Sequence, residues 1–136
     1  MDKIIKSDAQ WMKELSREQF QVCRHHGTEA PFSGRYHDCK DAGTYRCVCC
    51  GTELFSSRTQ FDSGCGWPSF FAPLQKEHLT TREDFSFGMH RIEVLCARCD
   101  AHLGHVFDDG PEPTGLRYCI NSVALTFDPD ATKTEP

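Results

Sequence analysis

The chain has 136 residues, of which 38% are hydrophobic, and a formal net charge of −5 at pH 7. This length predicts a single domain, which we expect over residues 1–128. No apolar run reaches the roughly 20 residues of a membrane helix, and the chain begins without the apolar core of a secretory signal. These features favour a cytoplasmic protein with no membrane partner. The negative charge argues against a nucleic-acid partner, because such proteins carry basic surfaces.

Two short helices are predicted at the start of the chain. Ser7 or Asp8 can cap the first helix, and Ser16 with Gln19 has the Ser-x-x-Gln form of a capping box that opens the second. Gly27 is a natural stop for the second helix. We expect both helices to pack on the outside of the domain.

From Tyr45 onward the segments become short, rich in aromatic and β-branched residues, and separated by Gly, Pro, Asp and Ser. Alternation of apolar and polar residues within them predicts antiparallel sheets with one buried face. The tail over 129–136 lacks apolar residues that could anchor it, and we expect it to be disordered. The predicted strands span 45–49, 52–55, 85–96, 102–107 and 118–127.

Two Cys-x-x-Cys motifs are the strongest signal in the sequence. Cys47 with Cys50 and Cys96 with Cys99 can supply four thiolates to a tetrahedral zinc ion. Such a site has no open position for water, so the zinc would be structural. Cys49 breaks the two-residue spacing and should be free. The alternative is a pair of redox-active Cys-x-x-Cys motifs.

A cysteine between two glycines lies in the segment 64–70. This context predicts a permissive, exposed turn for Cys65. Trp67, which precedes a proline, is either a plug of the core or the wall of an apolar pocket. A mobile Cys65 beside that pocket could attack an oxidised sulfur atom.

Two histidines follow directly after the second Cys-x-x-Cys motif. His102 and His105 could donate protons near neutral pH, or they could be alternative zinc ligands. The remaining histidines have no comparable neighbours in sequence and are interpreted as surface or structural residues. They are His25, His26, His37, His78 and His90.

Cys119 lies in a polar patch of an otherwise apolar predicted strand. Arg117 and Asn121 are two residues away on either side, so the three side chains should share one face. A neighbouring cation lowers the pKa of a thiol and increases the thiolate fraction, which is the nucleophilic form. Asn121 could orient a substrate or a histidine. The alternative is a buried and inert Cys119.

In their order along the chain, these motifs resemble those of the B-type peptide-methionine (R)-S-oxide reductases. The resemblance runs from the N-terminal helices to Phe127. It implies a mainly β fold with two antiparallel sheets of the β-roll or β-tent kind and short helices outside. It also implies one structural zinc ion, remote from the active site. The motifs are the two Cys-x-x-Cys pairs, Gly-Cys-Gly-Trp-Pro-Ser-Phe, His-Leu-Gly-His-Val-Phe and Arg-Tyr-Cys-Ile-Asn-Ser.

The resemblance implies a role for each site residue. Cys119 would attack the sulfur of a methionine (R)-sulfoxide, free or in a protein. His102 and His105 would bind and protonate the sulfoxide oxygen, and Trp67 would pack on the substrate methyl group. Asn121 would orient the site.

Two further roles follow from the same resemblance. Arg117 belongs to the nucleophile motif. Cys65 matches the recycling cysteine, which would form a Cys65–Cys119 disulfide after Cys119 becomes a sulfenic acid, and thioredoxin would reduce that disulfide. Three further cysteines leave open which thiol forms this bond. They are Cys23, Cys39 and Cys49.

Three other functions remain in competition at this stage. One is a glutathione-handling lyase on a related zinc-stapled β fold. The second is a zinc-ribbon binding module, and the third is a chaperone that senses oxidants by releasing zinc. We expect a monomer in every case.

Overall fold

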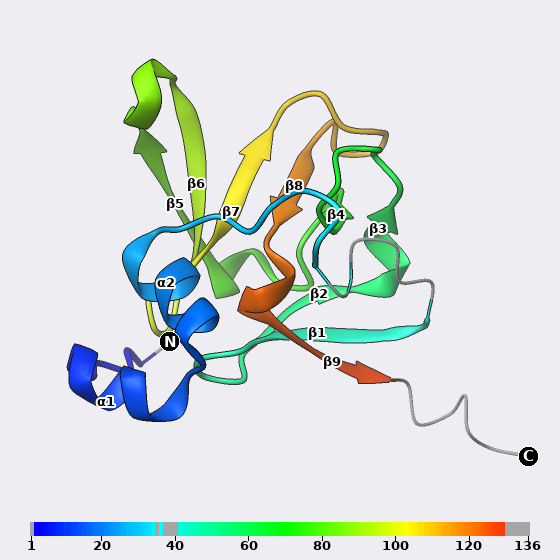
Figure 1. The fold of residues 1–136 in the computed structure, drawn as a ribbon. Helices are drawn as coiled ribbons and strands as arrows, with labels where there is room; N and C mark the ends of the chain where they lie inside the picture. Colours follow the sequence, from blue (N-terminus) through cyan, green and yellow to red (C-terminus); the bar gives the residue numbers. More distant parts are fainter. Residues whose placement is uncertain (1, 35, 37–40, 130–136) are drawn as a thin grey trace, which may run out of the picture.

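The computed structural model describes residues 2–34, 36 and 41–129, and it confirms the mainly β fold. Two antiparallel sheets form the body, and two short helices lie beside them at the N-terminal end (Figure 1). Neither of these helices is long and apolar enough to cross a bilayer, nor is any other helix of the described ranges. The sheets have the strand orders β2-β1-β9 and β3-β4-β8-β7-β6-β5.

The helices begin where the sequence predicts. In α1 (Asp8–Glu14) and α2 (Arg17–His25), the side chain of the capping serine accepts a hydrogen bond from the backbone N–H of the third helical residue. The side chain of that residue, a glutamine, accepts one from the backbone N–H of the serine. The stop of α2 lies one residue earlier than expected, because His26, with φ of 57°, takes the left-handed position. Helix α2 packs against β7, so it is partly enclosed by the domain.

The smaller sheet has β1 at its centre. Tyr45 of β1 is fully buried, and its ring packs on Phe70 and Phe127 at centroid distances of 5.2 and 4.8 Å. Alternate residues of β1 are buried, as the predicted alternation requires. The strands are β1 (Gly43–Cys47), β2 (Glu53–Ser56) and β9 (Leu125–Pro129).

The larger sheet carries the site residues. The prediction of a strand over 102–107 is confirmed, whereas the prediction over 85–96 is wrong in its first half, where a hairpin tip lies. The sequence missed β5 because this edge strand is mostly exposed and polar, and so lacks apolar alternation. The strands are β3 (Gln60–Phe61), β4 (Ser69–Phe70), β5 (Leu79–Asp84), β6 (Arg91–Cys96), β7 (His102–Phe107) and β8 (Arg117–Ile120).

The single strand predicted over 118–127 is also wrong. Strand β8 ends at Ile120, a 3-10 turn covers Ser122–Ala124, and β9 then joins the other sheet. Ala124 and Leu125 are both buried, because this turn crosses the core between the sheets. Pro129 ends β9, so the predicted disordered tail does not begin there; residues 130–136 lie outside the described part.

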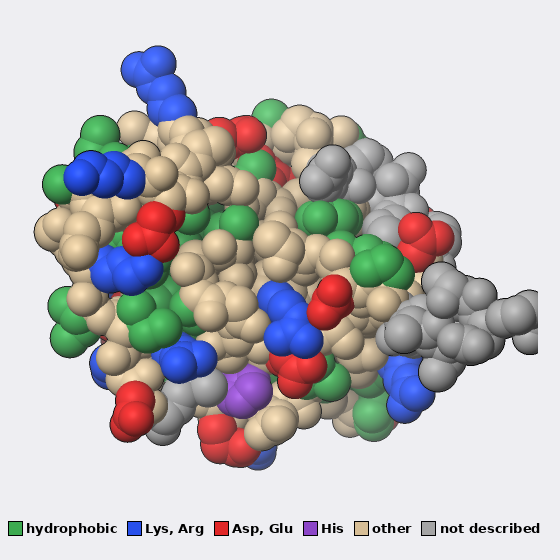
Figure 2. Space-filling view, turned by 90° about the horizontal axis from the view of Figure 1, so that it is seen from below, with side chains coloured by type: hydrophobic (Ala, Val, Ile, Leu, Met, Phe, Trp, Pro, Cys, Tyr) green, Lys and Arg blue, Asp and Glu red, His purple; other side chains and the backbone are tan. Residues whose placement is uncertain are grey.

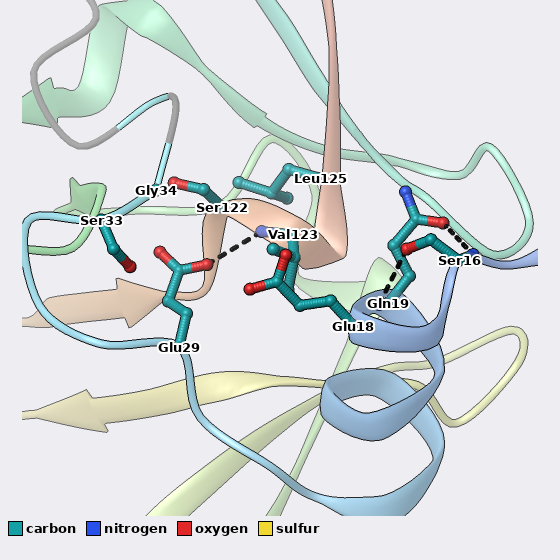
Figure 3. Close-up of a pocket in the computed structure, with 9 residues that line it drawn as sticks. All are labelled: Ser16, Glu18, Gln19, Glu29, Ser33, Gly34, Ser122, Val123 and Leu125. Atoms are coloured by element: carbon teal, nitrogen blue, oxygen red, sulfur yellow. Dashed lines mark hydrogen bonds between the residues drawn. The ribbon is translucent and has the colours of Figure 1, made fainter.

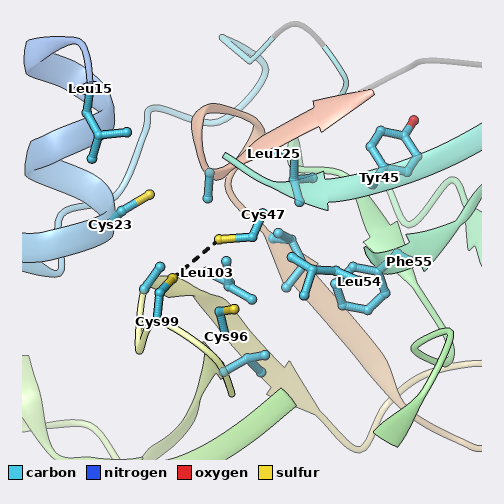
Figure 4. Packing of buried hydrophobic residues seen from close by; sticks show 14 of the residues in the cluster. Leu15, Cys23, Tyr45, Cys47, Leu54, Phe55, Cys96, Cys99, Leu103 and Leu125 are labelled. Atoms are coloured by element: carbon cyan, nitrogen blue, oxygen red, sulfur yellow. Dashed lines mark hydrogen bonds between the residues drawn. The ribbon is translucent and has the colours of Figure 1, made fainter. Parts of the chain in front are cut away.

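The core fills the space between the two sheets (Figure 4). Trp11 of α1 is buried with the aromatic residues of the sheets, and Phe55 stacks on Phe70 at 4.4 Å between ring centroids. The cysteines of both Cys-x-x-Cys motifs border this core. On the face shown in Figure 2, acidic and basic side chains are interspersed among polar and apolar ones.

Candidate active site and metal centre

Four cysteine side chains converge at the junction of the two sheets. The Sγ atoms of Cys47 and Cys99 are 3.6 Å apart, and those of Cys50 and Cys96 are 3.5 Å apart (Figure 4 shows the first pair). Zinc with Zn–S bonds of about 2.3 Å in tetrahedral geometry separates its sulfur atoms by about 3.8 Å. The group could hold a metal ion and is compatible with zinc. Cys49 is not part of it, as predicted.

The two motifs use the same turn to present their thiols. In the first, Gly51 N–H donates to the Cys47 carbonyl, and in the second, Asp100 N–H donates to the Cys96 carbonyl. Gly51 and Asp100 both have positive φ, 80° and 61°. Since Cys47 ends β1 and Cys96 ends β6, a metal ion here would join one sheet to the other.

A second group of thiols, separate from the four-cysteine group, consists of Cys65 and Cys119. Cys65 Sγ is 3.1 Å from Cys119 Sγ, and both cysteines are reduced. Cys119 is in β8 and pairs with Ser69 of β4, while Cys65 lies in the turn that leads into β4. The pairing of β4 with β8 therefore brings together two residues that are 54 positions apart in sequence.

The two thiols differ in their tendency to ionise. Burial would raise the pKa of Cys65, but hydrogen bonds from Ser63, Ser69 and Cys119 outweigh it and lower the pKa to about 7. Burial raises the pKa of Cys119 to about 12, and the neighbouring Cys65 adds to this effect. Ionisation is therefore easier at Cys65 than at Cys119.

Arg117 contacts the thiol as the sequence predicts. Its Nη1 atom lies 3.5 Å from Cys119 Sγ, and its guanidinium group is held by Asp109 and stacked over Phe107 at 4.5 Å. The positive charge lowers the pKa of Cys119, yet burial and the Cys65 charge have the larger effect. A cation nearby in the sequence predicts that the pKa of Cys119 is lowered, but not that burial and Cys65 outweigh this effect.

A small cavity of about 70 Å³ opens onto Cys119. Trp67 forms one wall and is fixed by its Nε1–H, which donates to the Glu29 carbonyl at 3.1 Å. Gly104 is required here, because a Cβ atom at this position would lie 2.0 Å from the Cys119 carbonyl oxygen. Four of the predicted site residues line this cavity: Trp67, His105, Cys119 and Asn121.

The two histidines lie side by side on β7, and His105 lines the cavity. Their ring centroids are 5.5 Å apart, and neither belongs to the four-cysteine group. His105 Nε2 is 2.8 Å from an Asp84 oxygen, and this hydrogen bond keeps the pKa of Asp84 below its usual value. His102 does not line the Cys119 cavity; it is buried, and burial lowers the pKa of its imidazole.

Sequence reasoning missed the carboxylate that organises this region. Glu93 Oε2 lies 2.6 Å from His102 Nδ1 and 2.5 Å from His26 Nδ1, and Glu93 Oε1 accepts two hydrogen bonds from Arg82. His26 is therefore not a simple surface residue. The signal was Glu93, a charged residue in a strand whose residues Glu93–Cys96 are all buried.

Glu93, His26 and His102 form a second group that could hold a metal ion. The two nitrogen–oxygen distances, 2.5 and 2.6 Å, are those of direct hydrogen bonds. A bridging metal with bonds of about 2.0 Å would hold these atoms roughly 3 Å apart. Hydrogen bonding is thus the better description.

Asn121 directs its side chain to the backbone. Its Nδ2 donates to the Leu103 carbonyl at 3.0 Å, and its Oδ1 accepts from Glu29 N–H at 2.9 Å. The Glu29 carboxylate in turn accepts from Val123 N–H at 3.0 Å (Figure 3). Asn121 thereby ties the segment that holds Trp67 to the strand that carries the histidines.

Comparison with known proteins agrees with this arrangement. The SelR domain family matches residues 15–129. A peptide methionine sulfoxide reductase MsrB of Hahella chejuensis is 60% identical over 127 residues, covering 93% of this chain and 91% of the relative. The protein of the same name from Pseudomonas putida is 60% identical over 129 residues, covering 95% and 97%. The chain therefore belongs to the SelR-domain family, the MsrB-type peptide methionine sulfoxide reductases, which are oxidoreductases that reduce methionine sulfoxide.

Proposed function

We propose that this enzyme reduces methionine (R)-sulfoxide, free or in proteins, with Cys119 as the nucleophile and Cys65 as the recycling thiol. One observation carries the proposal: Cys119 opens onto a cavity walled by Trp67 and His105, and its Sγ atom lies 3.1 Å from that of Cys65. Family membership sets aside the lyase, zinc-ribbon and chaperone alternatives. The R preference rests on the family resemblance.

The cavity suits a methyl sulfoxide group. The indole face of Trp67 offers an apolar surface for the methyl group and excludes water from it. His105 lies on the same cavity and can give a proton to the sulfoxide oxygen. His102, held by Glu93 beside His105, would assist from behind.

The first step transfers oxygen to Cys119. The Cys119 proton passes to Cys65 along their hydrogen bond, and the resulting thiolate attacks the sulfoxide sulfur. Arg117 stabilises this thiolate at 3.5 Å. With a proton delivered to its oxygen, the sulfoxide loses that oxygen to the Cys119 sulfur. The products are methionine and a Cys119 sulfenic acid.

The second step restores the thiol state. Cys65 attacks the Cys119 sulfur, the Cys65–Cys119 disulfide forms, and water leaves. An external dithiol, for which we propose thioredoxin, then reduces the disulfide by exchange. The net reaction consumes two thiol hydrogens and yields methionine and water.

We further propose that the four-cysteine centre holds one structural zinc ion. Cys47, Cys50, Cys96 and Cys99 would all be ligands, which leaves no position open for substrate. The ion would fix the junction of the sheets and take no part in the redox steps. We expect a monomeric cytoplasmic enzyme, because a reducing compartment suits free thiols.

Turnover of the separated R and S epimers of a blocked methionine sulfoxide, with dithiothreitol, tests the proposal. The wild-type protein should reduce only the R epimer, and Cys119→Ser should lose all activity because the nucleophile is gone. Folded, zinc-loaded wild-type protein that turns over neither epimer would overturn the proposed function.

A further inference from the structure

The hairpin that joins β5 to β6 carries three exposed apolar side chains. Phe85, Phe87 and Met89 are 64%, 88% and 44% exposed. The hairpin projects from the edge of the larger sheet, and its tip stands clear of the body (Figure 1). Several large apolar side chains grouped at one exposed tip indicate a contact surface more often than single ones do.

The fold itself does not require an aromatic residue at position 87. Phe87 has φ of 57° and ψ of 27°, a left-handed conformation that Gly or Asn adopts readily and a bulky residue does not. Its side chain is almost fully exposed, so core packing does not repay this cost. An aromatic residue is therefore kept at a position where turn chemistry favours a small polar one.

The tip borders a groove that leads to the proposed nucleophile. This groove, of about 380 Å³, is lined by Phe85 and Phe87 of the hairpin and by His102 and His105 of β7. It shares three residues with the cavity at Cys119: Thr28, Arg91 and His105.

The relative sizes of the two spaces indicate how a substrate would divide between them. The Cys119 cavity, about 70 Å³, is far smaller than the groove, about 380 Å³. It has room for the end of a methionine side chain, so neighbouring residues of a polypeptide must lie outside it. The groove is the adjoining space that can receive them.

Most charged side chains of the groove wall are paired within it, whereas Glu83 has its partner, His90, outside the groove. Arg82 bonds Glu93 at 2.8 Å, and Arg91 lies 3.4 Å from Asp84. Opposite charges that already neutralise each other do not call for a charged partner. Besides these charged side chains, the hairpin tip presents an exposed apolar surface to a partner.

We propose that residues Phe85–Met89, with the groove behind them, dock the apolar residues that flank an oxidised methionine in an extended polypeptide. This inference rests on the proposed function and names its substrate class. An unfolded chain exposes the apolar side chains that a folded one buries, so apolar residues beside a methionine sulfoxide are accessible to the tip. The tip would then favour unfolded protein over the free amino acid.

Phe87→Asn is the informative variant, because Asn fits the left-handed backbone and should leave the hairpin folded. Three substrates are compared. Two are blocked pentapeptides with a central methionine (R)-sulfoxide, flanked by Leu in one and by Ser in the other. The third is blocked methionine (R)-sulfoxide itself, the blocked residue. We expect kcat/KM for the Leu peptide to fall roughly tenfold through KM. Rates on the Ser peptide and on the blocked residue should stay unchanged.

Two further variants make the test specific. Met12→Gln removes an apolar side chain that is 62% exposed on α1 and should change none of the three rates. Phe85→Ser should reproduce the Phe87→Asn pattern.

Equal kcat/KM for Leu and Ser peptides in the wild-type protein would overturn the inference, as would sedimentation showing that the tip instead joins two copies of this chain. If the wild-type protein does not reduce the blocked residue at all, that result would instead count against the proposed function.

Discussion

At the scale of single residues, one proton separates the resting enzyme from the attacking one. Hydrogen bonds from Ser63 and Ser69 help place the resting charge on Cys65, while burial keeps Cys119 protonated. This arrangement would protect the proposed nucleophile, Cys119, from unwanted oxidation, because the thiol form reacts slowly. Cys65 is thus proposed both to take the proton and later to close the disulfide.

Cys65→Ser tests the recycling role. With thioredoxin as the reductant, its steady-state turnover should fall by about 100-fold or more, because no adjacent thiol traps the sulfenic acid, whereas dithiothreitol should still support turnover. Mass mapping of the oxidised wild-type protein should find Cys65–Cys119 as the main bridge. A main bridge from Cys119 to Cys23 or to Cys39, which lies outside the described residues, would contradict this.

At the scale of elements, β6 and β7 hold a buried charge network. Burial keeps the pKa of His102 below its usual value of about 6.5. The unfolded chain therefore binds a proton near pH 6 that the folded chain does not bind. Stability contributed by neutral His102 is present above pH 6.5 and is lost as the pH falls.

The unfolding free energy should accordingly fall between pH 7 and pH 5.5, by up to about 1.4 kcal/mol per pH unit for this one proton. In His102→Gln, which does not titrate, the slope should be smaller by up to that amount. Urea unfolding at the two pH values, with zinc content checked at each, measures it. Identical slopes in the two proteins would refute the assignment.

At the scale of the whole molecule, the four-cysteine centre links the two sheets. Cys47 ends β1 of one sheet and Cys50 follows it, while Cys96 ends β6 of the other sheet and Cys99 follows it. Binding of a structural zinc ion contributes directly to folding, and its free energy is comparable to the whole stability of a small domain. The centre and the active site are separate, so zinc should affect stability first and activity only as a consequence.

The Cys96→Ser protein should therefore be unfolded at room temperature and show no cooperative thermal transition. A strong chelator should have the same effect on the wild-type protein. Cys49→Ser is the matched control, because Cys49 adjoins a ligand but is outside the group. It should keep its zinc and most of its melting temperature. A zinc-free Cys96→Ser protein that melts at the wild-type temperature would rule out this role.

The sequence by itself determined the features that depend on local spacing. Patterns within a few residues predict the capping serines Ser7 and Ser16, the four cysteines that could hold a metal ion, and the strand over 102–107. The resemblance to a known family supplied the pairing of Cys65 with Cys119, which spacing alone left open.

Only the tertiary structure decided features that join distant segments. It broke 118–127 at Ser122, because the chain must cross between sheets, and it placed Glu93 between His26 and His102. It also raised the pKa of Cys119, which the neighbouring Arg117 was expected to lower, because burial and hydrogen bonding depend on packing that no local pattern records.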